Sequence, residues 1–332
     1  MKICRLALFF PLVIAITGLS ACQEPYHEQK ERYVFIASNI NLPYWQEAQA
    51  GLTDAAKQMG VKAEFDGPEK LDPKEELNAF KKAVDSKPAG ILVSVARPEL
   101  FQEAINAAIV VGIPVIAVDA DAPESKRVLF IGTDNFRAGQ ESARRMAQIL
   151  QGKGQIALIV LSGQQNLEER LRGVTDALKK YPDIKVVQTI DDAGDPRVAN
   201  DSVSNLLHGK TKIDGIISLE ASGGEGAAEA VHRQDMEGKV VIVAFDKDPE
   251  TLDWIEKGVI TATVTQKPYV MGYYGLKFAD DLHHNAVHDF KDWRTAPTPP
   301  LPTWVDTGTA IVDKANVKAF REALAAHPKS IL

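Results

Sequence analysis

Two aromatic rings follow the first apolar stretch of the chain and stand beside amide side chains. Tyr44 and Trp45 come directly after Pro43, and Asn41 lies just before it. Rings next to amide groups suit a small molecule with one apolar face and a rim of hydroxyl groups, such as a sugar or a polyol. The alternative is that both rings only pack a helix onto a sheet, as core aromatics do.

Polar side chains that can form hydrogen bonds stand after several other apolar stretches. Six segments contribute these eight residues: Arg97, Asp119, Asp121, Asn166, Arg170, Glu220, Asp246 and Gln266. Any one of them alone fits a helix cap or a surface charge better than a binding site. Together, at the carboxyl ends of the strands of two sheets, they predict a binding site between two lobes.

The motifs of common catalytic and cofactor sites do not occur. The chain has no Gly-x-Ser-x-Gly elbow and no pairing of a cysteine with a histidine. Gly209-Lys210-Thr211 precedes an expected strand, whereas a phosphate loop follows one. Gly223-Gly224-Glu225-Gly226 lacks the glycine spacing of a dinucleotide fingerprint, and we interpret it as close backbone packing near a cleft. We therefore expect a binding protein without a cofactor, not an enzyme.

Metal sites are also not predicted. His283, His284 and His288 are candidate metal ligands because His284 and His288 share a helical face. We interpret this region instead as a solvated helix end or loop. The acidic run at 191–195 does not match a calcium loop of the EF-hand type. We expect Asp195 to cap the helix that follows it.

The first 22 residues have the layout of an export signal. Lys2 and Arg5 precede an apolar run, and small residues then lead to Cys22. Leu19-Ser20-Ala21-Cys22 resembles the bacterial lipobox, which implies cleavage before Cys22 and a lipid on its thiol. Ordinary cleavage nearby and an uncleaved anchor remain as alternatives. We expect residues 1–21 to be the signal peptide and residues 22–32 a polar tether.

Composition narrows the partners. The chain is 332 residues long with 45% hydrophobic and 25% charged residues, which is typical of a globular protein of roughly two domains. The formal charge of -7 argues against nucleic acid as a partner. Of the two cysteines, Cys4 would leave with the signal peptide, so an internal disulfide is not possible in the mature chain.

Strands and helices alternate along the chain, which predicts an α/β fold with parallel, doubly wound sheets. Apolar runs predict strands at 34–37, 61–65, 90–96, 114–119, 128–131, 155–161, 184–190, 213–219, 240–245, 261–265 and 303–312. Helical spacing, caps and prolines predict helices between them: one that begins at 73, with Asp72 as its cap, and others near 45–59, 98–111, 135–150, 166–180, 196–207, 224–234, 249–257, 268–284 and 316–325.

With these elements in place, the chain resembles the periplasmic sugar-binding proteins of the ribose and galactose type, the substrate-binding subunits of ABC importers. The resemblance rests on six stretches: Pro43-Tyr44-Trp45, Gly112 to Ile116, Ile131 to Asn135 with Ala138-Gly139, Arg170 to Gly173, Ala244-Phe245-Asp246 and Gln266-Lys267-Pro268. It implies two Rossmann-like lobes joined by three crossing strands. The lobes would be residues 33–133 plus 267–295 and residues 134–266 plus 296–332.

The resemblance also implies roles for single residues. Tyr44 and Trp45 match the stacking aromatics of the family, and Arg170 matches its sugar-hydroxyl arginine. The remaining matches are Asn166 at a nearby polar position, Asp246 as the late carboxylate and Gln266 as the amide of the last crossing.

Four positions depart from the family pattern: Leu42, Gly194 and the two charged residues Arg97 and Glu220. Arg97 stands where ribose-type members have Asp or Asn, and Glu220 stands where they have Asn. Since buried charges need partners, Arg97 and Glu220 either pair across the closed cleft or Arg97 holds an acidic ligand.

We therefore expect an extracytoplasmic, lipid-anchored, monomeric binding protein that delivers a sugar or polyol to an ABC permease and its ATPase. The alternative is a lipoprotein sensor that presents a sugar-like ligand to a chemoreceptor or a membrane kinase.

Overall fold

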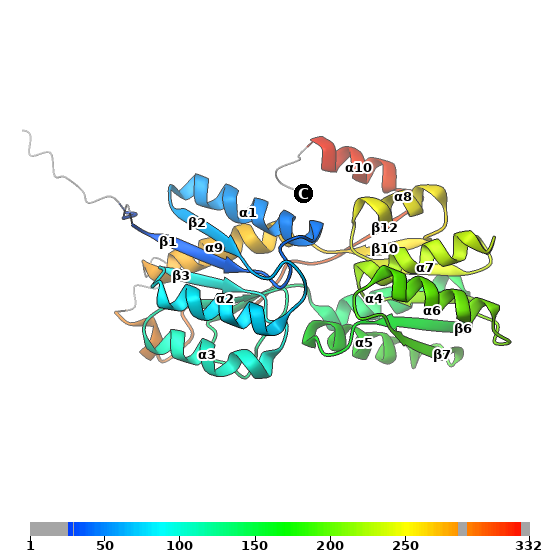
Figure 1. The fold of residues 1–332 in the computed structure, drawn as a ribbon, viewed down its shortest axis with the longest axis horizontal. Coiled ribbons are helices and arrows are strands. Elements are labelled where there is room, and N and C mark those ends of the chain that lie inside the picture. The colour runs from blue at the N-terminus through cyan, green and yellow to red at the C-terminus, as the bar shows by residue number, and fades with distance from the viewer. Residues whose placement is uncertain (1–25, 29, 285–290, 327–332) are drawn as a thin grey trace, which may run out of the picture.

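Two lobes, each built from one sheet with helices on both faces, lie side by side along the longest axis of the molecule (Figure 1). The computed structural model describes residues 26–28, 30–284 and 291–326. The expected export signal, the lipidation site Cys22 and His288 lie outside the described residues. Among the described helices, none has the length and apolar character needed to cross a membrane.

The first sheet gives the first lobe its core. Its strands lie in the order β11 (Trp304–Asp306), β5 (Leu129–Gly132), β4 (Val115–Val118), β3 (Gly90–Val93), β1 (Arg32–Ile36) and β2 (Lys62–Asp66). All of its pairs are parallel. One face packs on α1 (Pro43–Met59) and α9 (Pro268–His283), and the other packs on α2 (Pro73–Asp85) and α3 (Pro98–Val110). The two central strands, β3 and β4, are buried along their whole length, as their apolar runs predict.

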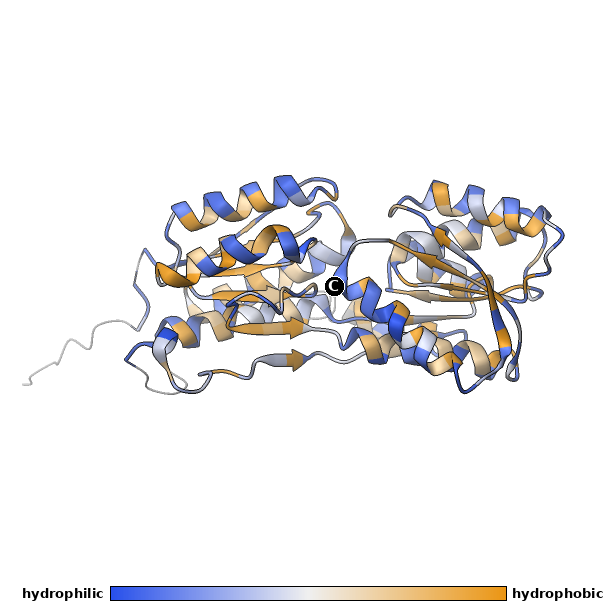
Figure 2. Ribbon diagram, turned by 90° about the horizontal axis from the view of Figure 1, so that it is seen from below, coloured by the Kyte–Doolittle hydropathy of each residue, from blue (hydrophilic) through white to orange (hydrophobic). Residues whose placement is uncertain are grey.

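The second lobe repeats this plan. Its strands lie in the order β12 (Ala310–Asp313), β10 (Ala262–Thr265), β9 (Val241–Phe245), β8 (Gly215–Ser218), β6 (Lys153–Val160) and β7 (Asp183–Asp191). One face packs on α4 (Asn135–Ile149) and α5 (Gln165–Leu178). The other packs on α6 (Pro196–His208), α7 (Ala221–Arg233), α8 (Pro249–Lys257) and α10 (Val317–Ala326). Figure 2 shows hydrophobic strands under helices that turn hydrophilic residues outward.

Helix ends follow the local sequence. Asp72 accepts the backbone N–H groups of Lys74 and Glu75 at the start of α2, and Asp195 accepts that of Arg197 at the start of α6. The cap at Asp195 confirms the role expected for that carboxylate, and Asp72 does the same for α2.

The chain passes between the lobes three times. Hydrogen bonds tie the passages together: Thr133 donates to Gln266 (2.8 Å), and the backbone N–H of Asp134 donates to Asp306 (3.1 Å). The sequence predicted one last strand over 303–312 and assigned all of 296–332 to the second lobe. Both predictions are wrong. β11 pairs in parallel with β5 of the first sheet, and β12 pairs antiparallel with β10 of the second. Gly308, at a φ of 72°, separates these two strands at the third passage.

Candidate functional site between the lobes

Two carboxylates occupy corresponding positions in the two lobes. Asp119 follows β4 and Asp246 follows β9, and both have a positive φ, 66° and 69°. Their backbone N–H groups donate to the neighbouring strand, to Ile131 (3.0 Å) and Val264 (2.9 Å) respectively. A residue other than glycine in this conformation costs about 1–3 kcal/mol and is typical of binding sites. The two lobes therefore hold their carboxylates at the facing sheet edges in the same way.

Asp119 links the first lobe to the second. Its Oδ1 accepts the hydroxyl of Tyr44 (2.5 Å), and its Oδ2 accepts the side-chain amide of Asn166 from α5 (3.3 Å). The carboxylate is 6% exposed, and this burial raises its pKa to about 6. The ring, the carboxylate and the amide expected from the sequence thus form one connected group across the cleft.

Close packing of two helices sets the position of Arg170. A Cβ atom at Gly139 of α4 would overlap the carbonyl oxygen of Arg170, and one at Gly173 would overlap that of Phe136. Only glycine permits this approach of α5 to α4. Because Arg170 lies at the contact, its backbone is fixed by the second lobe itself.

The guanidinium of Arg170 is held from three sides. Its Nε donates to Asn135 (2.7 Å), its Nη1 donates to the carbonyl of Leu219 (2.8 Å), and the group lies 4.5 Å from the ring centroid of Phe245. The side chain is 2% exposed. Such a fixed fork of donors suits the recognition of hydroxyl or carboxylate oxygens.

Asp246 and Gln266 form the matching group of the second lobe. The amide of Gln266 donates to Asp246 (2.8 Å), while its carbonyl accepts the hydroxyl of Thr133. Burial raises the pKa of Asp246, and the positive charge of Arg170 opposes this rise. The polar group is therefore continuous from the second sheet to the passages between the lobes.

One ion pair crosses the cleft at its mouth. Lys247 Nζ lies 2.7 Å from Glu47 Oε1, and both side chains are largely buried. Burial raises the pKa of Glu47 to about 7, against the opposing effect of Lys247. No local sequence pattern indicates this contact, since the two residues lie 200 positions apart.

A cavity of about 520 Å³ opens beside this group. It lies between the start of α1 and the loop after β9, and α10 forms part of its wall through Arg321 and Leu324. Tyr44, Asp246 and Gln266 are among its lining residues. Its volume is within the range of about 300–1,000 Å³ that is usual for small-molecule sites.

Two residues expected in the site lie elsewhere. Trp45 is 4% exposed and packs edge-on against Phe35 in the core of the first lobe, so the structure agrees with the packing alternative. Asn41 is exposed and donates to the carbonyl of Glu69. Trp45 points its ring toward the sheet because it lies on the face of α1 that covers β1, whereas Tyr44 lies one residue earlier.

Arg97 and Glu220, the two charged departures from the family pattern, do not contact each other. Glu220 caps α7, accepting the backbone N–H of Ser222 (2.7 Å) and that of Gly223. Burial, with Asp192 close by, raises the pKa of Glu220. Arg97 lies beside Glu99 (3.7 Å) and against the backbone of Gly163 in the other lobe. Of the two alternatives left open by the sequence, the pair of Arg97 and Glu220 is therefore not formed, because the carboxylate of Glu220 caps its own helix.

Three further residues of the site had no role predicted from the sequence, although they lie in stretches that carry the family resemblance. Thr133 and Asn135 belong to the stretch after β5, and Phe245 precedes Asp246. The glycines at 223 and 226 do provide close packing, since a Cβ atom at Gly226 would overlap the carbonyl of Pro196.

Comparison with known proteins identifies the family. A family model described as the periplasmic binding protein domain matches residues 33–285. The chain belongs to the periplasmic binding proteins. The family resemblance noted in the sequence, the α/β fold of two lobes, and the expectation of a binding protein in place of an enzyme are confirmed.

Individual periplasmic binding proteins are similar over most of their length. The D-allose-binding periplasmic protein of Escherichia coli K12 is 29% identical over 259 residues, which cover 75% of this chain and 83% of that protein. A solved sugar ABC transporter sugar-binding protein from Bacillus halodurans is 34% identical, with a TM-score of 0.80, over 87% of this chain and 99% of that one. A chain of the XylFII-LytSN complex is 28% identical, with a TM-score of 0.78 and the same coverage.

Proposed function

We propose that this protein captures a neutral sugar or polyol between its lobes and delivers it to an ABC importer. The observation that carries the proposal is the group of buried polar side chains shared by both lobes: Tyr44, Asp119, Asn166, Arg170, Asp246 and Gln266. The names of the similar proteins support it, since they include an allose-binding protein and a sugar-binding protein of an ABC transporter.

The chemistry of these side chains favours a ligand rich in hydroxyl groups. Each hydroxyl can donate to a carboxylate and accept from a guanidinium or an amide. Asp119 and Asp246 accept, whereas Arg170, Asn166 and Gln266 donate. A ligand would replace the contacts that these side chains make with one another, such as the one between Asn166 and Asp119.

The balance of charge favours a neutral ligand over a sugar acid. Asp119 and Asp246 flank a single buried guanidinium, that of Arg170. Among the other cations near the cleft, Lys247 forms an ion pair with Glu47, and Arg97 is 44% exposed at its side chain and lies beside Glu99. A carboxylate on the ligand would add a third negative charge next to Asp119 and Asp246, which buried sites disfavour.

Closure of the lobes would couple ligand capture to delivery. Ligand contacts to both lobes favour the closed form over the open one, because an open form satisfies only half of them. Contacts such as the ion pair of Glu47 and Lys247 would also form on closure. A micromolar dissociation constant corresponds to about 8 kcal/mol, which several charge-assisted hydrogen bonds can supply net of the closure cost.

Titration calorimetry against pentoses, hexoses, polyols and sugar acids tests this function. We expect one neutral sugar or polyol to bind with micromolar or tighter affinity. If no compound of the panel binds, the proposed function is wrong. If only sugar acids bind, the argument from charge is wrong, and Arg97 becomes the first residue to substitute.

The anchor is a separate part of the proposal. We propose a periplasmic or outer-surface location, a lipid on Cys22, and a monomer that meets the permease and its ATPase. A Cys22→Ser variant should move from the membrane fraction to the soluble periplasmic fraction. Retention of that variant in the membrane would exclude the lipid as the anchor.

A ligand-sensing role is the second candidate, and the likeness to a chain of the XylFII-LytSN complex favours it. Deletion of the gene separates the two candidates. Loss of ligand uptake in the deletion strain supports transport. Normal uptake together with a lost transcriptional or chemotactic response to the ligand supports sensing.

A further inference from the structure

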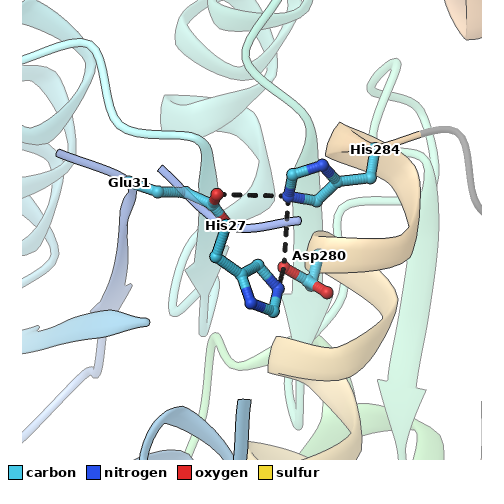
Figure 3. A group of neighbouring side chains, drawn as sticks. All are labelled: His27, Glu31, Asp280 and His284. Atoms are coloured by element: carbon cyan, nitrogen blue, oxygen red, sulfur yellow. Dashed lines mark hydrogen bonds and ion pairs between the residues drawn. The ribbon is translucent and has the colours of Figure 1, made fainter. Parts of the chain in front are cut away.

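Four metal-binding side chains converge at the end of the first lobe that lies away from the cleft (Figure 3). His27 and Glu31 precede β1, and Asp280 and His284 lie at the end of α9. Each offers one ligand atom, and these four atoms all lie within 4.8 Å of one another. Two segments 253 positions apart thus meet through histidine and carboxylate groups.

The distances are those of a site that needs little adjustment to hold an ion. His27 Nε2 lies 3.0 Å from Asp280 Oδ1, and His284 Nε2 lies 3.1 Å from Glu31 Oε2 and 3.7 Å from Asp280 Oδ1. Bonds of about 2.0–2.2 Å to a tetrahedral zinc ion place neighbouring ligand atoms roughly 3.3–3.5 Å apart. The observed separations lie on both sides of that value.

Burial and charge also fit a divalent cation. The side chains of Glu31 and Asp280 are 2% and 6% exposed, so two carboxylates lie together out of water. With neutral imidazoles from His27 and His284, the four groups carry two negative charges, which a dication neutralises. An N₂O₂ set of imidazole and carboxylate suits zinc better than magnesium or calcium, which prefer oxygen ligands alone.

The hydroxyl of Tyr33 contacts both carboxylates. Its hydroxyl oxygen lies 2.8 Å from Glu31 Oε1 and 2.9 Å from Asp280 Oδ1, so its single proton can be donated to either carboxylate, and the ring is fully buried. Such partners of the ligands are a regular part of metal sites.

We propose that His27, Glu31, Asp280 and His284 bind one zinc ion, which fastens the N-terminal segment to α9. The expectation of a solvated helix end without a metal is thereby replaced for His284. His283 is not part of the set, since its ring lies edge-on to Tyr33. The ion has a structural role at the start of the first lobe, separate from the cleft.

Equilibrium titration of the full chain, without a histidine tag and after treatment with a chelator, tests the site. Zinc is added in competition with a chromophoric chelator, and bound metal is counted by mass spectrometry. We expect one ion per chain, bound at least 100-fold more tightly than by His27→Gln or Asp280→Asn. Cobalt in place of zinc should give the visible spectrum of a four-coordinate ion, which His27→Gln should lose.

The matched control is His232→Gln. His232 also contacts a carboxylate, that of Glu237, but on the exposed surface, so this variant should bind zinc like the unmodified chain. His27 lies before the first strand, so its substitution leaves both sheets intact. Binding that is absent, or that His27→Gln and Asp280→Asn both leave unchanged, overturns the site. The side chains would then form only a hydrogen-bonded network.

The sugar panel keeps this test apart from the proposed function. His27→Gln should bind the sugar with unchanged affinity because the four ligands lie away from the cleft. If the chain binds zinc but no sugar, the metal site is supported and the proposed function is wrong. If it binds a sugar but no zinc, the proposed function is supported and the metal site is wrong.

Discussion

Replacing Asp119 with asparagine should make the protein more stable above pH 6 and weaken its ligand binding. The carboxylate is 6% exposed, and burial raises its pKa to about 6. Below about pH 3 the carboxyl is protonated in both the folded and the unfolded chain, so aspartic acid and asparagine are nearly equivalent there. As the pH rises toward 6, the unfolded chain ionises first, and folding of the unmodified chain loses free energy.

The size of this effect follows from the pKa. A rise of about two units from the ordinary value corresponds to about 3 kcal/mol, fully developed above pH 6. Asparagine gives up the charged acceptor for Tyr44 and Asn166, which offsets about half of that gain. It tolerates the positive φ of 66° at this position at least as well as aspartate does. We expect a net gain of about 1–2 kcal/mol, or roughly 2–8 °C in melting temperature.

Thermal and urea denaturation of both chains between pH 4 and pH 8 measures the effect. The matched control is Asp121→Asn, two residues along the chain, whose carboxylate pairs with Arg127 (2.6 Å). That control should lose stability at pH 7 and keep its ligand affinity. A stability difference for Asp119→Asn that is negative at pH 8, or that does not vary with pH, would refute the reasoning.

Ligand binding is measured on the same Asp119→Asn variant. Loss of a charge-assisted hydrogen bond costs about 1.5–3 kcal/mol, so calorimetry should show an affinity about 10–100-fold lower. Unchanged affinity would remove Asp119 from the proposed site while leaving the stability argument intact.

Three further substitutions probe the same region. Arg170→Met should lower ligand affinity at least 100-fold and raise the pKa of Asp119 further, as followed by NMR titration, because the nearest cation is gone; an affinity within threefold would contradict this. Trp45→Ala should lower the free energy of unfolding by about 3–5 kcal/mol in urea denaturation, since the ring is core; an unchanged unfolding curve with lost binding would restore its stacking role. Gly139→Ala should lower both stability and affinity, since its Cβ atom would push α5 and Arg170 away from α4; normal values for both would show that the helices can part at no cost.

The sequence was most informative about the sheets and the edges at which they carry polar residues. Strands buried on both faces have continuous apolar runs, so 34–37 and 240–245 could be recognised, and Asp246 could be placed at the end of its strand. The parallel topology then brings such ends together without any further information.

Sequence reasoning failed where the outcome depended on which way a side chain turns or on a distant partner. Tyr44 and Trp45 are neighbours, and only the packing of α1 on β1 decides that the first reaches Asp119 and the second enters the core. The contact between Glu47 and Lys247 leaves no local pattern at all. Likewise, His284 was considered with His288, its neighbour on a helix, whereas its observed partners come from the start of the chain.

The order of strands in the two sheets has a consequence for how the polypeptide is made. The first sheet lacks the cover of α9 until residue 283 has been added and lacks its edge strand until residue 306, while the edge of the second sheet waits for residue 313. A ribosome must therefore deliver almost the entire polypeptide before either half is complete. The export proposed for this protein requires an unfolded chain, and this order of synthesis delays the completion of both lobes until most of the chain has been made.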